Sequence, residues 1–192
     1  MKNQMIQSAI EYIEKLFSDD YGGHDVEHTK RVYRNALMIT QTEPECDLFI
    51  VSLGALLHDV DDHKLFHTEN NANARAFMES LHLDATQINR ICELINSISF
   101  SKNRGQKPAT LEGQIVQDAD RLDAIGAIGI ARTFAFGGER KRPLSATVQH
   151  FYDKLLLLKD EMNTDEGKRQ AEHRHELMVN FLSELNIEMK NE

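Results

Sequence analysis

Apolar residues recur every three to four positions along almost the whole chain, which is the pattern of amphipathic α-helices. Sustained alternation of β-branched and polar residues, the usual sign of strands, does not appear. The spacing predicts helices over residues 3–17, 26–41, 48–60, 70–82, 85–98, 111–133, 144–162 and 165–188. We therefore expect an all-α fold, folded as a single domain over residues 1–192 with a C-terminal helical part at 144–188.

The run LFIVSLGALLHDV, residues 48–60, is apolar nearly all round and predicts the most buried helix of the fold. Pro44 breaks the preceding helix, and Asp47 can cap the new one. The run carries His58 and Asp59 near its end. Burying either group without a partner would cost several kcal/mol. A divalent metal ion would satisfy an imidazole and a carboxylate together, so this end of the helix is a candidate metal site.

Two other stretches offer further ligands for such an ion. GGHDVEH places His24, Asp25 and His28 at the junction of a loop and a helix. VQDADRLDAIGAIGIART opens with three acids and continues with small residues that allow close helix packing. Three acids carried into a core need a cation, whereas capping at a helix start accounts for only one of them. The acids are Asp118, Asp120 and Asp123, of which the second and third share a helix face.

These motifs, in this order, resemble the HD-domain superfamily of metal-dependent phosphohydrolases. The resemblance implies a helical bundle with a metal site between helices, its motifs spread over residues 24–123. Matched residue by residue, the implied metal ligands are His28, His58, Asp59 and Asp120. Asp118, two residues before the last of these, is an open alternative. The stretches GHD, DDHK, ISFSK and DRLDAIGAIGIAR resemble a narrower branch of small bacterial hydrolases, some of which act on nucleoside triphosphates.

Two imidazoles and two carboxylates form a mixed nitrogen and oxygen ligand set. Such a set suits transition-metal ions better than Ca²⁺. We expect one divalent ion, with Mn²⁺ as the first choice and Co²⁺, Ni²⁺, Fe²⁺, Zn²⁺ or Mg²⁺ as alternatives. A second ion would need further histidines, for which the chain offers only His63 and His67 near the doublet, and these serve equally well as solvated surface residues.

A water nucleophile needs a proton acceptor beside the ion. Asp62 lies one helical turn beyond His58 if the helix continues, and the matching position in other HD hydrolases carries an acid with that role. Asp61 is the alternative acceptor. Lys64, which closes the same motif, is the second predicted catalytic residue.

Phosphate recognition is expected from basic residues near these motifs, because the chain as a whole is acidic. Arg104, in the same loop as Lys102, is a further candidate, and Arg132, Arg140 and Arg142 are weaker ones. His24 and Asp25 either orient a ligand histidine through hydrogen bonds or touch the substrate, and Asp123 either supports the ligands or faces the substrate. The predicted substrate-binding residues are His24, Asp25, Arg31, Lys102, Arg121, Asp123, His150 and Lys154.

Composition and charge restrict the function further. The 41% hydrophobic and 28% charged residues are typical of a soluble globular protein, and a net charge of −9 argues against binding to a nucleic-acid backbone. No stretch is apolar enough for a membrane helix, so we expect no membrane partner and a cytoplasmic location. A homodimer through an apolar face of the terminal helix is an open alternative. The two cysteines predict no disulfide framework.

The predicted function is hydrolysis of a phosphorylated small molecule, in the first place a nucleotide. The narrower resemblance favours splitting a nucleoside or deoxynucleoside triphosphate into the monophosphate and pyrophosphate. A phosphomonoesterase or phosphodiesterase on the same scaffold is one alternative. A noncatalytic module, in which the metal braces a nucleotide-sensing fold, is another.

Overall fold

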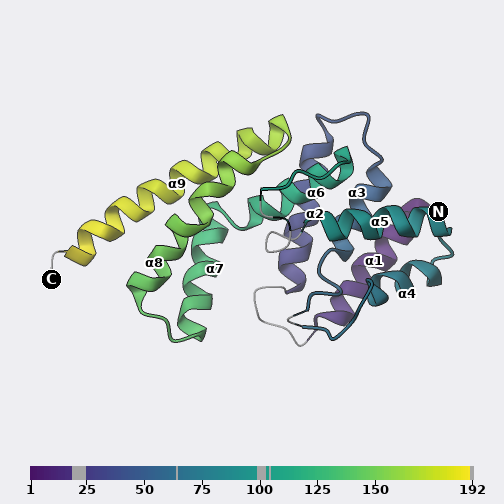
Figure 1. The fold of residues 1–192 in the computed structure, drawn as a ribbon, viewed down its shortest axis with the longest axis horizontal. Helices are drawn as coiled ribbons and strands as arrows, with labels where there is room; N and C mark the ends of the chain where they lie inside the picture. The colour runs from purple at the N-terminus through teal and green to yellow at the C-terminus, as the bar shows by residue number, and fades with distance from the viewer. Residues whose placement is uncertain (19–24, 64, 99–102, 104, 191–192) are drawn as a thin grey trace. The chain divides into compact units, whose positions relative to one another are not determined.

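The computed structural model describes residues 1–18, 25–63, 65–98, 103 and 105–190. In these ranges the regular elements are α-helices and one 3₁₀ helix, without a strand (Figure 1). The all-α prediction is confirmed. The chain divides into two compact units, Met1–Asp120 and Arg121–Glu192. That the whole chain acts as one domain stays a prediction. No helix in the described ranges is both long and apolar enough to cross a membrane.

The first unit is built around one buried helix. Its elements are α1 (Lys2–Leu16), α2 (Val26–Thr40), α3 (Leu48–Leu57), α4 (Ala72–Ser80), α5 (Ala85–Ile98) and α6 (Leu111–Asp123), the end of which passes into the second unit. Helix α3 packs against α1, α2 and α5, and every residue from Phe49 to Leu57 is buried. The Asp47 carboxylate accepts hydrogen bonds from the amides of Phe49 and Ile50, as expected of a cap. The predicted central helix is therefore confirmed.

Helix α3 ends at Leu57, before the His58-Asp59 doublet. The prediction of a helix as far as residue 60 is wrong at this end. His58 keeps helical dihedral angles, and the chain then turns, with the amide of Asp62 donating to the carbonyl of Asp59 at 3.0 Å. His58 and Asp59 consequently lie at the end of a buried helix, and Asp62 lies in a turn with Asp59 rather than one helical turn beyond His58.

The second unit consists of α7 (Gly126–Glu139), α8 (Leu144–Asp153), the 3₁₀ helix η1 (Leu155–Glu161) and α9 (Asp165–Lys190). Helix α7 packs against α8 and α9, and η1 packs against the same two helices. Single helices over 111–133 and 144–162 were predicted, and both predictions are wrong. The first breaks before Gly126, whose φ of 74° lies outside the helical region, and the second breaks at Lys154, with φ −141° and ψ −60°.

Gly129 of α7 lies against the backbone that precedes its own helix. A Cβ atom at this position would lie 2.3 Å from the carbonyl oxygen of Ala124. We expect Gly129→Ala to lower the free energy of unfolding by about 1–3 kcal/mol, because backbone must move to make room. Thermal unfolding measures the loss. Gly138→Ala on the same helix is the matched control, since its Cβ would meet no atom within 4 Å. Equal melting temperatures for the two variants would contradict the prediction.

Candidate metal centre

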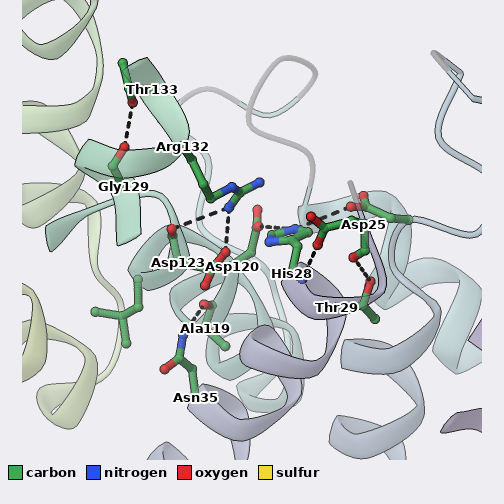
Figure 2. Close-up of polar contacts among 12 residues, drawn as sticks. Asp25, His28, Thr29, Asn35, Ala119, Asp120, Asp123, Gly129, Arg132 and Thr133 are labelled. Carbon is green, nitrogen blue, oxygen red and sulfur yellow. Dashed lines mark hydrogen bonds and ion pairs between the residues drawn. The ribbon is translucent and has the colours of Figure 1, made fainter. Parts of the chain in front are cut away.

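Three elements of the first unit bring a cluster of ligand atoms together. His28 comes from the first turns of α2, His58 from the end of α3, and Asp120 from α6. One ligand atom from each of these three residues lies within 4.8 Å of the other two. Asn35 of α2 donates to the carbonyl of Ala119 at 3.1 Å, which ties α2 to α6 beside the cluster (Figure 2).

Asp59 lies beside both histidines. Its Oδ2 is 3.4 Å from Nε2 of His28 and 3.3 Å from Nε2 of His58. Oδ1 of Asp120 is 3.5 Å from Nε2 of His28 and 4.0 Å from Nε2 of His58 (Figure 2 shows His28 and Asp120). Two atoms that each lie about 2.1 Å from one ion are about 3.0 Å apart at a right angle and about 4.2 Å apart on opposite sides. The distances between each carboxylate and the two imidazoles fall in or near this range, and His28, His58 and Asp120 together form a cluster that could hold one ion.

The His58 ring is oriented for ligation. Its Nδ1 lies 2.8 Å from the carbonyl oxygen of Ala55, so the Nδ1 proton is donated there. Its Nε2 is buried and has no hydrogen-bond partner. An imidazole nitrogen left in this way, beside two carboxylates, requires a proton or a metal ion. This buried nitrogen, which makes no hydrogen bond and lies 3.3 Å from the nearer carboxylate, shows that the residues present fit a divalent metal.

Exposure differs around the cluster. The side chains of His28 and His58 are each 4% exposed and that of Asp59 is 12% exposed, whereas Asp120 is 30% exposed. One side of the cluster is therefore accessible to water. A structural metal site is usually closed, and a catalytic site keeps an open position.

The charge of the carboxylates acts strongly on His58 when no metal is bound. Burial favours the neutral imidazole, but Asp59 and then Asp120 outweigh that effect and raise the pKa of His58 to about 9. At neutral pH the metal-free imidazole therefore holds a second proton. A metal ion must displace that proton to reach Nε2.

We accordingly expect metal binding at pH 7.5 to release about one proton from His58. The apparent affinity should rise with pH until the pH passes about 9, the pKa of this group, and then level off. Calorimetric titration with Mn²⁺ in buffers of different ionisation enthalpy counts the protons. The same titration at pH 10 is the internal control, because His58 is then already neutral. A heat that does not depend on the buffer at pH 7.5 would refute the prediction.

Asp25 holds the backbone at the start of α2. Its Oδ1 accepts a hydrogen bond from the amide of His28 at 2.6 Å, and its carbonyl oxygen lies 3.5 Å from Oγ1 of Thr29 (Figure 2). The carboxylate is therefore the N-cap of the helix that carries His28, and it fixes the backbone of that residue. Its predicted contact with substrate stays a prediction, and His24 lies outside the described residues.

The two acids left open as alternatives differ in the structure. Asp118 is completely buried and is not part of the ligand cluster, whereas Asp120 is. Asp61, the alternative proton acceptor, already accepts two hydrogen bonds, from the amides of Asn73 at 2.9 Å and Ala74 at 3.0 Å. The Asp61 alternative is therefore disfavoured. The side chain of Asp62 is 17% exposed, with its Oδ1 4.0 Å from Nδ1 of the exposed His63.

Arg121, expected to bind the substrate, and Asp123, expected either to support the ligands or to face the substrate, have protein partners in the second unit. The guanidinium of Arg121 is buried and bonds to the carbonyl oxygen of Glu161, and it lies 3.0 Å from that residue's carboxylate. The buried carboxylate of Asp123 pairs with Arg132 at 2.5 Å (Figure 2). The sequence pattern carried no sign of Glu161, because the pairing depends on how η1 folds back onto the end of α6.

The other predicted substrate residues are distributed over both units. Arg31 is half-buried and lies one turn after His28 on α2. His150 is half-buried on α8, and burial, together with the charges of Lys154 and Arg142, lowers its pKa. Lys64 and Lys102 lie outside the described residues. Contact of these residues with a substrate stays a prediction.

Known proteins resemble the chain over nearly its full length. A family model described as the HD domain matches residues 25–125. The protein YpgQ of Bacillus subtilis is 40% identical over 183 residues, which cover 91% of this chain and 88% of YpgQ. The crystal structure of YpgQ in complex with ADP aligns with a TM-score of 0.86 and 34% identity, over 97% of this chain and 96% of that one. An HD-superfamily hydrolase of Bacillus thuringiensis aligns with a TM-score of 0.81 and 36% identity over 100% of both chains.

Proposed function

Since the chain belongs to the HD-domain family, we propose that it is a metal-dependent phosphohydrolase whose metal ligands are His28, His58, Asp59 and Asp120. The observation that carries this proposal is the buried Nε2 of His58, which has no hydrogen-bond partner and lies between a second imidazole and two carboxylates. A bound divalent ion would supply a Lewis acid for a phosphoryl oxygen and would lower the pKa of a water molecule. Mn²⁺ is the first candidate.

Residues of the chain would hold the ion, accept a proton and contact the substrate. The two nearly inaccessible histidines and Asp59 would fix the ion, while the partly exposed Asp120 would leave room for a substrate oxygen. Asp62, in the turn that closes onto the carbonyl of Asp59, would accept the proton of the attacking water. Arg31 on α2 would contact a phosphate group of the substrate.

We propose a nucleoside or deoxynucleoside triphosphate as the substrate, cleaved to the monophosphate and pyrophosphate. The complex of YpgQ with ADP supports a nucleotide ligand for a relative that matches nearly the whole chain. Cleavage between the α- and β-phosphates rests on the resemblance of the GHD, DDHK and DRLDAIGAIGIAR stretches to hydrolases of that kind.

The test is turnover of a panel of nucleotides by metal-stripped protein resupplied with Mn²⁺, Co²⁺, Ni²⁺, Zn²⁺ or Mg²⁺. Pyrophosphate and orthophosphate are assayed separately. Metal-dependent release of pyrophosphate supports the proposal, whereas orthophosphate alone would indicate a phosphomonoesterase. Stoichiometric metal binding without turnover of any nucleotide would favour a metal-braced sensing module.

A further inference from the structure

The turn that carries Asp59 and Asp62 is bonded to the start of α4. Both oxygens of the Asp61 carboxylate accept backbone hydrogen bonds, Oδ1 from Asn73 at 2.9 Å and Oδ2 from Ala74 at 3.0 Å. In return, Nδ2 of Asn73 donates to the carbonyl of Val60 at 2.7 Å. We call these four residues, Val60, Asp61, Asn73 and Ala74, the clamp. It joins two segments of the first unit through three hydrogen bonds.

The α4 side of the clamp is itself held in place. Asn70 and Asn71 both adopt positive φ angles, 56° and 57°, immediately before the helix begins. Residues other than glycine adopt this left-handed conformation at a cost in free energy. They keep it where surrounding contacts impose it. Nδ2 of Asn71 donates to the carbonyl of the buried Cys92 on α5, and Nε of Arg75 donates to the carbonyl of Asn70. Helix α5 packs on α3, so the start of α4 is tied to the core.

From this arrangement we infer that the clamp is a positioning device for the metal centre, with Asp61 and Asn73 as its positioning residues. The inference rests on the proposed function. Val60 and Asp61 lie between Asp59 and Asp62, so bonds to both of them fix the backbone from which these two carboxylates project. A ligand or base must be held to within about 0.5 Å of its working position, and supporting hydrogen bonds provide that precision. Asp61 therefore serves the site without touching the ion.

A simpler role for Asp61 would be to cap α4 and stabilise the fold. The chain contains a matched case for comparison. Asp47 also accepts two backbone hydrogen bonds at the start of a helix, from Phe49 and Ile50, although both go to its Oδ1, and it lies at the end of α3 away from His58. If Asp61 were only a cap, its loss, like the loss of Asp47, would lower the stability of the fold and leave the metal affinity unchanged. The positioning role predicts a metal centre that only the loss of Asp61 disturbs.

The experiment measures the dissociation constant for Mn²⁺, by competition with a chelator, in wild type, Asp61→Ala, Asn73→Ala and Asp47→Ala. Thermal unfolding of the metal-free proteins is measured alongside. We expect Asp61→Ala to bind Mn²⁺ about 10–100-fold more weakly, which is the usual effect of losing a residue that supports a metal ligand. Asn73→Ala should bind Mn²⁺ about 10-fold more weakly. Asp47→Ala should lose stability and keep the wild-type dissociation constant.

Asn73→Ala keeps the inference testable if Asp61→Ala does not fold, because it removes only the bond to Val60 and leaves both backbone amides in place. A wild-type dissociation constant in Asn73→Ala and Asp61→Ala, or an equal weakening in Asp47→Ala, overturns the inference. The metal affinity is measured in the absence of nucleotide, so this test does not depend on the proposed substrate. Wild-type protein that binds Mn²⁺ but hydrolyses no nucleotide would therefore overturn the proposed function and leave the clamp to be judged on affinity alone.

Discussion

Replacing His58 with glutamine is expected to remove metal-dependent turnover and to weaken metal binding by at least about 100-fold. That loss exceeds the effect of removing a residue that only supports a metal ligand. Nε2 of His58 is the buried nitrogen without a hydrogen-bond partner, and Asp59 and Asp120 lie 3.3 and 4.0 Å from it. Glutamine has a similar reach but offers an amide in place of the imidazole lone pair. Metal content after dialysis and pyrophosphate release, measured on the same preparation, test both effects.

His173→Gln is the control for this substitution, because His173 is an exposed residue on α9 and the chemical change is the same. It should retain the metal and the turnover of wild type. If His58→Gln kept a full equivalent of metal and normal turnover, the ion would have to bind elsewhere, and the proposed ligand set would be wrong.

The metal cluster could be predicted because its members carry strong local signals. A helix apolar on all sides had to be the core helix, and the doublet at its end then had to be compensated. The order of the motifs, together with the resemblance to HD-domain proteins, favoured Asp120 and left Asp118 as an alternative. In the structure Asp120 joins His28 and His58, while Asp118 is buried outside the cluster.

The errors fall where tertiary contacts decide the backbone. Small apolar residues around Gly126 continue a helical pattern, so nothing in the periodicity indicated the break before that residue. The role of Asp61 was missed for a related reason. Its partners Asn73 and Ala74 lie twelve and thirteen positions further on, beyond the reach of any helical spacing, and they depend on two asparagines in left-handed conformations.

Asp62→Asn is expected to leave metal binding nearly unchanged and to lower kcat by about 10²–10⁴-fold, the contribution of a positioned general base. The substitution keeps the shape of the side chain and removes its ability to take a proton. Because Asp62 is a proposed base and not a ligand, the loss should fall on kcat, with the dissociation constant for Mn²⁺ within a few-fold of wild type. Steady-state kinetics at saturating metal measure the first quantity, and chelator competition measures the second.

Asp165→Asn, at the exposed first turn of α9, is the matched control and should show neither effect. The paired measurements separate three roles for Asp62. A lower kcat with unchanged metal binding would support Asp62 as the general base. Loss of metal binding in proportion to kcat would make Asp62 a ligand, and the His28, His58, Asp59 and Asp120 set would then need revision. Unchanged kcat would take Asp62 out of the mechanism, and the proton acceptor would have to be sought among other groups beside the ion.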